Sequence, residues 1–345
     1  MRQLVYTQPG RVEWRDSPGP ELTDEHSALV EPLAVARCDL DAPMVERDLF
    51  PGPYPVGHEL TGRIAAVGRQ VTRHAPGETV IVPYQVSCGH CGPCTAGTFA
   101  ACATYRAPIG GSFGFGPMGG GHGGAMADLL AVPAADHLLV TAPPGLSPSA
   151  LATLSDNVVD GYRSVGPPLA AQPGADVLIV ADAPGSVALY AAAVAVALNP
   201  GHVRFVDTDP DRVQAAAALG ADAARHHGTW PRRFGEAPIT VDATGHPDGL
   251  AAVLRSTARY GHCTILAFGF DPVTPVPLTE MYTRGITVHI SRADSLRYLP
   301  HVLQLIATTA FDPLAIPATV RPWDQAADAW LKPAVKLIIE RRSGY

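Results

Sequence analysis

Four closely spaced cysteines constrain this chain more than any other feature of its sequence. They are separated by two, two and seven residues and lie at Cys88, Cys91, Cys94 and Cys102. Thiolates at such spacings can supply the four soft ligands of a closed tetrahedral site, for which zinc is the usual ion. The pattern predicts a structural zinc lobe over residues 88–102.

Two other interpretations of these cysteines are disulfide bonds and a zinc ribbon that binds nucleic acid. No apolar run resembling a signal peptide follows Met1, so we expect a cytoplasmic protein in which disulfides are uncommon. The residues around the cysteines are small and neutral, and the formal net charge is -7. Both features argue against a nucleic-acid surface.

Length and composition indicate a protein of two domains with sizeable cores. The chain has 345 residues, of which 47% are hydrophobic and 17% charged. The most apolar stretch, residues 187–198, is too short to cross a bilayer, so we expect no membrane partner.

The first 150 residues or so read as short β-strands joined by turns rich in Gly and Pro, which predicts a partly closed β domain. The expected strands are residues 30–36, 62–67, 79–83 and 128–132. A glycine-rich segment at 110–124 is interpreted as a loop over a site.

From about residue 173 the pattern changes to alternating apolar strands and helices, which predicts a doubly wound parallel sheet and hence an α/β protein. A final strand at 335–339 is expected to rejoin the first domain. The expected strands of the sheet are 176–180, 202–206, 239–242, 263–268 and 286–290, and its helices are 187–198, 212–219 and 247–259.

A second metal site is suggested by Cys38, His58 and Asp156, with Glu59 able to orient or transiently replace a ligand. One thiolate, one imidazole and one carboxylate leave a fourth position open, which is the arrangement of a catalytic zinc. Each signal alone is weak, because a single Cys or His is more often a packed core residue and a single Asp more often caps a helix. Their occurrence beside the four-cysteine lobe favours the metal.

Six motifs stand out along the chain: Cys38-x-x-Asp41, Gly57-His58-Glu59-x-x-Gly62, Val82-Pro83-Tyr84, the four-cysteine lobe, Gly123-Gly124-Ala125-x-Ala127-Asp128 and Leu154-Ser155-Asp156. Together they resemble the motifs of the zinc-dependent medium-chain alcohol dehydrogenases, and the resemblance covers nearly the whole chain. The chain is similar in particular to the members that act on formaldehyde and other small aldehydes or alcohols.

The resemblance implies a GroES-like catalytic domain at residues 1–155, a Rossmann dinucleotide-binding domain at 156–290 and a segment at 291–345 that rejoins the first domain. It further implies two zinc ions per chain, NAD, a small-molecule substrate and a homo-oligomer, either dimer or tetramer. In such enzymes the zinc polarises the oxygen of the substrate while a hydride passes between carbon and nicotinamide.

The dinucleotide turn departs from the usual glycine-rich pattern. Residues 181–188 retain only Gly185, so a turn that binds dinucleotide poorly is a second interpretation. Asp207 ends the second strand, where a carboxylate accepts hydrogen bonds from ribose and repels a 2′-phosphate, which favours NAD; the nearby Arg212 weakens this preference. The cofactor contacts that we expect, with Lys336 at the pyrophosphate by resemblance, are Gly185, Ser186, Val187, Asp207, Arg212, Phe268 and Lys336.

The usual proton relay is also absent. Leu40 stands where family members commonly carry Ser or Thr, and Pro43 where a histidine is common. The main hypothesis is an NAD-dependent zinc oxidoreductase acting on a small alcohol, polyol or aldehyde. The alternatives are altered chemistry on the same fold, such as reduction of a conjugated double bond, and a non-catalytic zinc protein.

Overall fold

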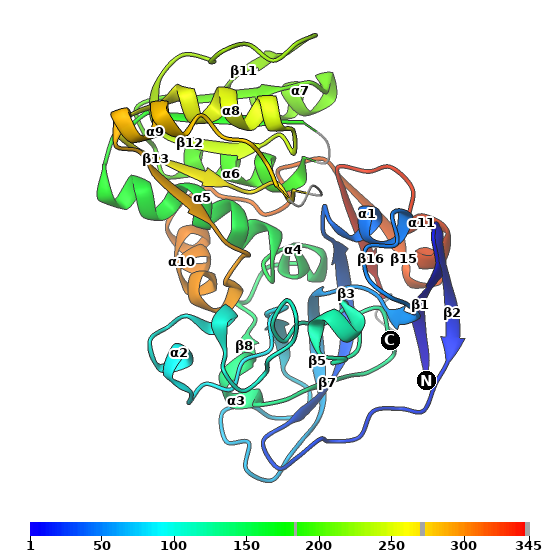
Figure 1. The fold of residues 1–345 in the computed structure, drawn as a ribbon. Coiled ribbons are helices and arrows are strands. Elements are labelled where there is room, and N and C mark those ends of the chain that lie inside the picture. Colours follow the sequence, from blue (N-terminus) through cyan, green and yellow to red (C-terminus); the bar gives the residue numbers. More distant parts are fainter. Residues whose placement is uncertain (183–184, 270–272, 342–345) are drawn as a thin grey trace. The chain divides into compact units, whose positions relative to one another are not determined.

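A computed structural model describes residues 1–182, 185–269 and 273–341 of the chain. Ala183 and Pro184 of the predicted dinucleotide turn therefore lie outside the described residues. The chain divides into two compact units (Figure 1). Unit 1 contains Met1–Val159, Asp294–Leu303 and the described residues from Ala318 onward, and unit 2 contains Asp160–Ala293 and Gln304–Pro317.

Unit 1 is built on antiparallel β structure. A three-stranded sheet has the order β2-β1-β4, and a larger sheet runs β15-β16-β3-β5-β6-β8, with β7 paired to β3. The strands are β1 Arg2–Gln8, β2 Arg11–Asp16, β3 Ala28–Arg37, β4 Tyr54–Pro55, β5 Glu59–Val67, β6 Thr79–Val82, β7 Leu130–Val132, β8 Val140–Thr141, β15 Ala318–Pro322 and β16 Lys336–Glu340.

Short helices complete unit 1. In α4, the Ser147 side chain accepts a hydrogen bond from the backbone N–H of Ala150, and Pro148 begins the helix, two features that favour a helix start. The helices within this unit are α1 Asp41–Glu46, α2 Gly92–Thr95, α3 Ala135–Leu138, α4 Pro148–Thr153 and α11 Ala326–Ala329, with 3₁₀ turns η1 Phe99–Ala101, η2 Gly116–Gly119 and η3 Trp323–Gln325.

Unit 2 is a six-stranded parallel sheet in the order β11-β10-β9-β12-β13-β14. Its strands are β9 Val177–Ala181, β10 Val203–Asp207, β11 Asp222–Arg225, β12 Ala237–Ala243, β13 Thr257–Ile265 and β14 Thr287–Ile290. Its helices are α6 Ser186–Ala197, α7 Pro210–Ala218, α8 Pro247–Ser256 and α9 Leu278–Arg284, while α5 Asn157–Ala171 and α10 Ser295–Thr308 each contain residues of both units.

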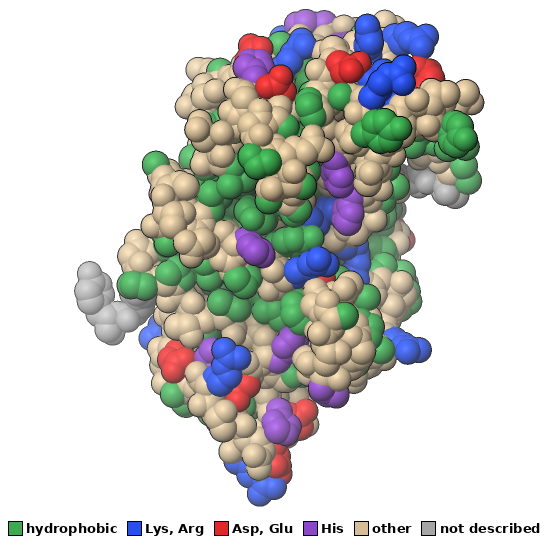
Figure 2. Space-filling view, turned by 90° about the vertical axis from the view of Figure 1, so that its left-hand side faces the viewer, with side chains coloured by type: hydrophobic (Ala, Val, Ile, Leu, Met, Phe, Trp, Pro, Cys, Tyr) green, Lys and Arg blue, Asp and Glu red, His purple; other side chains and the backbone are tan. Residues whose placement is uncertain are grey.

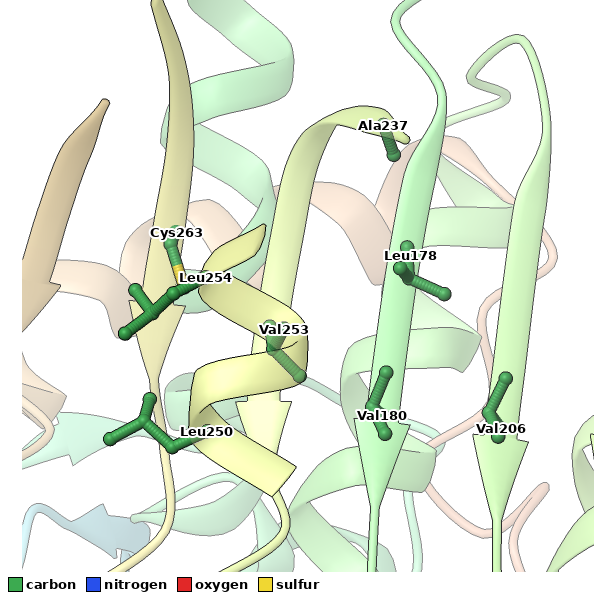
Figure 3. Close-up of a cluster of buried hydrophobic side chains, with 8 residues drawn as sticks. All are labelled: Leu178, Val180, Val206, Ala237, Leu250, Val253, Leu254 and Cys263. Atoms are coloured by element: carbon green, nitrogen blue, oxygen red, sulfur yellow. The ribbon is translucent and has the colours of Figure 1, made fainter. Parts of the chain in front are cut away.

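Strand β9, near the middle of this sheet, is buried along its whole length, as expected for a parallel strand covered on both faces. Figure 3 shows α8 packed on one of these faces, with Leu254 beside Cys263 of β13; Leu250 and Val253 belong to the same buried cluster as Leu178 and Val180 of β9. The strand predicted at 176–180 is observed as β9, Val177–Ala181, and contributes to the core of unit 2. No helix among the described residues has both the length and the apolarity needed to cross a membrane.

The predicted α/β class, with a β domain and a doubly wound parallel sheet, is confirmed. The helix predicted at 247–259 is too long, because α8 ends at Ser256 and residues 257–259 begin β13. That strand ends at Ile265, so its predicted span of 263–268 was displaced. The β-branched Thr257 and Thr264 suit a strand: Thr257 pairs with Ala237 of β12, and Thr264 pairs with Val241 of β12 and His289 of β14.

Asp242 is a buried carboxyl whose hydrogen-bond partner within the described residues is Thr244, and its burial leads to a prediction about stability. Thr244 Oγ1 donates a hydrogen bond to Asp242 Oδ1 at a distance of 2.8 Å. Burial nevertheless raises the pKa of Asp242 from 3.8 to about 6. Between about pH 4 and pH 6 the native state then binds more protons than the unfolded chain. Stability therefore falls as pH rises through this range and stays reduced above it.

We expect Asp242→Asn to raise the free energy of unfolding at pH 7.5 by roughly 2 kcal/mol, and to have little effect at pH 4. The exposed Asp222, changed to Asn, is the control. Urea unfolding at both pH values measures the difference. A loss of stability at pH 7.5 would show that the Asp242 carboxylate is needed in the native state.

Candidate metal centres and dinucleotide site

The four cysteines of the predicted lobe come together in unit 1. Their sulfur atoms all lie within 4.8 Å of one another, and none is in a disulfide. Two N–H or O–H donors from the following segment reach these sulfurs: Ala103 N–H to Cys91 Sγ at 3.3 Å and Thr104 Oγ1 to Cys88 Sγ at 3.1 Å. Such donors favour the thiolate form.

Electrostatics of this cluster favour a cation among the sulfurs. The hydrogen bond from the backbone N–H of Ala103 helps to lower the pKa of Cys91 to about 6, whereas burial raises the pKa of Cys94 to about 12. Four neighbouring thiolates repel one another and are costly to bury without a positive charge. A zinc ion would remove that cost, so these four residues fit the metal.

The second predicted set also comes together. Cys38 follows β3, His58 precedes β5, Glu59 begins β5 and Asp156 precedes α5. One ligand atom from each lies within 4.8 Å of the others, and His58 Nε2 is 3.3 Å from Asp156 Oδ2. Three of the four side chains are buried and Cys38 is half-buried. Residues nearly 120 positions apart in the sequence thus form one group of donors.

Asp41, the first residue of α1, positions two of these donors. Its Oδ2 accepts a hydrogen bond from the backbone N–H of Cys38 at 2.8 Å, and its Oδ1 lies 3.4 Å from His58 Nδ1. With Nδ1 directed at a carboxylate, Nε2 is left for a metal. The sequence analysis named Asp41 only as part of the motif Cys38-x-x-Asp41 and did not predict this role. The spacing of three residues from Cys38 was the one sequence feature that could have indicated it.

Glu59 is held by Lys336 in a fully buried ion pair. Lys336 Nζ donates to Glu59 Oε1 at 2.6 Å and to the carbonyl oxygen of Arg37 at 3.0 Å. Glu59 Oε2 is buried and has no hydrogen-bond partner among the described residues. The structure therefore places Lys336 beside the donor set, and its predicted contact with a pyrophosphate stays a prediction.

Burial strongly perturbs the titration of this set. Burial raises the pKa of Cys38 far above its usual range and that of Glu59 to about 8. For His58 burial acts downward, but the Asp41 and Asp156 carboxylates outweigh it and raise the pKa well above 6.5. A divalent cation would favour the thiolate, the carboxylates and the neutral imidazole together. The residues present therefore fit zinc.

Two aromatic rings border the imidazole. The centroid of the Phe115 ring lies 4.8 Å from the centroid of the His58 ring, and the centroid of the Tyr84 ring lies 5.3 Å from it. Phe115 belongs to the glycine-rich segment that was interpreted as a loop over a site. The ring centroids of Phe50 and Phe115 are 6.1 Å apart, so these two phenylalanines make the surroundings of His58 partly apolar.

In unit 2, the predicted cofactor residues cluster only in part. Gly185 precedes α6, and Ser186 and Val187 begin it. Asp207 ends β10, and Arg212 lies in the first part of α7. Phe268 follows β13 and is half exposed, while Lys336 belongs to unit 1.

Asp207 and Arg212 form the best-defined contact of this region. Arg212 Nε donates to Asp207 Oδ2 at 2.8 Å and Arg212 Nη2 to Oδ1 at 2.6 Å, while the backbone N–H of Asp209 also reaches Oδ1 at 2.9 Å. Both carboxylate oxygens of Asp207 are thus already paired. Sequence reasoning placed Arg212 nearby but did not predict that it would pair with both oxygens.

Comparisons with known proteins agree with this architecture. The family model described as the alcohol dehydrogenase GroES-like domain matches residues 24–144. A probable zinc-binding alcohol dehydrogenase of Mycobacterium tuberculosis is 29% identical over 96% of this chain and 84% of its own length. The solved alcohol dehydrogenase TADH from Thermus is 26% identical, with a TM-score of 0.89 over 99% of this chain and 100% of that one.

Two further relatives are more similar over shorter stretches. A glutathione-independent formaldehyde dehydrogenase of Pseudomonas aeruginosa is 33% identical over 65% of this chain and 58% of its own length. A medium chain reductase/dehydrogenase of Acremonium is 30% identical over 64% of this chain and 74% of its own length. The chain accordingly belongs to the zinc-dependent medium-chain alcohol dehydrogenase family and is an oxidoreductase.

Proposed function

We propose that this enzyme holds two zinc ions per chain and transfers a hydride between NAD and a small alcohol, polyol or aldehyde. The structural ion would lie among Cys88, Cys91, Cys94 and Cys102. The catalytic ion would be held by Cys38, His58 and Asp156, with Glu59 beside it. The observation that carries this proposal is the second set: four buried or half-buried donor atoms within 4.8 Å of one another.

A zinc ion at that set would act as a Lewis acid on the substrate oxygen. The protein's own residues would orient and enclose the reacting groups. Asp41 lies beside the His58 ring, Lys336 holds Glu59, and the rings of Phe115 and Tyr84 pack beside the imidazole. Aromatic side chains of this kind are common in sites for small molecules.

The proposed substrate class is supported by the names of relatives. One is a formaldehyde dehydrogenase and another, 27% identical over 86% of this chain, is the L-threonine 3-dehydrogenase of Bacillus subtilis. The hydride carrier is proposed as NAD because Asp207 ends β10, where a carboxylate disfavours a 2′-phosphate. A screen of small alcohols and aldehydes with NAD and NADH tests the proposal. Reduction of conjugated double bonds without any alcohol oxidation would contradict it.

Asp156 tests the catalytic ion. We expect Asp156→Ala to bind one zinc equivalent instead of two and to lower turnover by about 1,000-fold or more, because it removes both a ligand and a negative charge. The change leaves the thiolate lobe intact, so the melting temperature should fall only slightly. The exposed Asp324, changed to Ala, is the control for loss of a carboxylate in unit 1. Metal analysis that finds two equivalents in Asp156→Ala would exclude Asp156 as a ligand.

Cys91 tests the structural ion. We expect Cys91→Ser to lose the other zinc equivalent and to expose residues 88–102 to proteolysis, since three thiolates no longer close a tetrahedron. Cys263→Ser is the matched control, because Cys263 is a buried cysteine of unit 2 outside both donor sets. If both variants keep two zinc equivalents, the four cysteines do not form a zinc site.

We also propose that the protein is a homo-oligomer assembled through the edge of the parallel sheet. β14 is the last strand in the described sheet order and pairs only with β13 there. Ile290 of β14 is 72% exposed, and Tyr282 of the preceding helix α9 is 83% exposed. An edge strand that carries exposed apolar side chains favours pairing with a second copy. Hydrophobic side chains also reach the surface in several places on the face drawn in Figure 2.

Ile290 provides the test of this assembly. We expect Ile290→Lys to shift the protein toward the monomer, because a buried unpaired ammonium is costly in an apolar interface. Val320→Lys is the control, since Val320 is an exposed apolar residue of unit 1. Sedimentation equilibrium measures the mass of each variant. An unchanged oligomer in Ile290→Lys would place the interface elsewhere.

A further inference from the structure

His137 of α3 contacts the four-cysteine lobe near both of its ends. Its Nε2 lies 2.8 Å from Oγ of Ser87, the residue before Cys88. The centroid of its ring lies 5.3 Å from that of Phe99, three residues before Cys102. Cys88 is the first of the four proposed zinc ligands along the chain and Cys102 is the last. One side chain from outside the lobe therefore contacts the chain near both.

Gly89 allows the imidazole to lie this close to the lobe. Its φ is +80°, and a Cβ at this position would lie 2.8 Å from His137 Cγ and 2.9 Å from Nδ1. These distances are too short for a real side chain, so a larger residue would push the ring away from Ser87. Gly89 directly follows Cys88. The residues on either side of that cysteine thus both contact His137.

The hydrogen bond between Ser87 and His137 is formed out of contact with solvent on the serine side. Ser87 is fully buried, and within the described residues its hydroxyl has no other hydrogen-bond partner. Without the imidazole this hydroxyl would be both desolvated and unpaired, which is unfavourable. The segment that leads into Cys88 is therefore stabilised at His137.

The helix that carries His137 is fixed to unit 1 by a separate set of contacts. Asp136, the preceding residue, accepts hydrogen bonds from the backbone N–H groups of Thr72 and Arg73 at 2.9 Å each, and from the Thr72 hydroxyl at 2.9 Å. Arg73 Nη1 also donates to the carbonyl oxygen of Asp136 at 3.0 Å. These bonds hold α3 to the segment before β6, so His137 is presented to the lobe from a fixed helix.

We propose that His137 is a positioning residue for the structural zinc site, which holds both ends of the lobe against α3 and so keeps the four thiolates in place. This inference rests on the structural ion of the proposed function and adds to it a residue that is not a ligand. Residues that support metal ligands from outside are commonly worth about 10- to 100-fold in metal affinity. Loss of the ring should therefore speed the release of zinc while all four thiolates remain.

The experiment measures the release of zinc from the zinc-loaded protein to an excess of a chromogenic chelator, at a temperature where each variant is folded. We expect His137→Ala to speed the release of one zinc equivalent about tenfold or more and to leave the other unchanged. His137→Gln keeps a polar group able to bond to Ser87, so its rate should lie between those of His137→Ala and the unmodified protein. The same measurement in the Asp156→Ala background assigns the affected equivalent to the lobe.

His262→Ala is the matched control. His262 is also a half-buried histidine in contact with another ring, at 6.3 Å between its centroid and that of His289, but it lies in unit 2. Its removal should change neither rate of release.

Two further variants separate positioning from a general loss of stability. Ser87→Ala removes the hydrogen bond and keeps the ring. Its effect and that of His137→Ala should be less than additive in the double variant, because both changes break the same contact. Asp136→Ala frees α3 from residues 72 and 73, and it should speed release from the lobe more weakly than His137→Ala does.

Equal rates of release in His137→Ala and the unmodified protein would overturn the inference. So would an equal acceleration of both equivalents, because the ring would then support the fold as a whole and not the lobe. If His137→Ala does not fold, Ser87→Ala decides, and an unchanged rate in that variant counts against the role of His137. Should the Asp156→Ala protein contain no zinc, the proposed structural ion is wrong and this inference fails with it.

Discussion

The ion pair between Glu59 and Lys336 joins the end of the chain to its first domain. Lys336 begins β16, which pairs with β3, and Glu59 begins β5 on the other side of that strand. Both charged groups are fully buried, so the loss of either partner would leave an uncompensated charge, at a cost of about 3–5 kcal/mol. The last strand of the chain is therefore tied electrostatically to the segment that presents His58. Glu59 and Lys336 thus contribute both to the proposed metal site and to the attachment of β16 to the first domain.

Local spacing explains what could be predicted. The four cysteines lie within 15 residues, so their sequence spacing nearly determines their distances, and the strands of unit 2 are continuous apolar runs of a recognisable length. The second donor set is different, because Asp156 lies 98 positions from His58. Periodicity cannot predict such a contact. The ligand types and their occurrence beside the four-cysteine lobe suggested the set, a family resemblance agreed with it, and the structure brings the four side chains together.

The failures of prediction have physical causes too. The end of α8 was missed because residues 257–259 carry no strong breaker, and only pairing with β12 selects the strand. Strands β1, β2 and β11 were not predicted, since each mixes polar with apolar residues; β1 buries Leu4, Val5 and Tyr6, whereas β2 and β11 are mostly exposed or half-buried. The pairing of Arg212 with Asp207 depends on rotamers and on the free space above Gly185, which no sequence pattern contains.

The two units deal with buried carboxylates in different ways. Around Cys38 and Asp156 the chain offers more acidic ligands than Lys336 alone can neutralise. Within the part of the chain that the structure describes, Glu59 Oε2 has no hydrogen-bond partner, which favours an external divalent cation. Around Asp207 the chain supplies the cation itself, and both oxygens are satisfied without a ligand. An incomplete set binds its ion by relieving an existing electrostatic cost. A complete set carries no such cost, so a pair like that of Asp207 and Arg212 stabilises unit 2 without a bound ion.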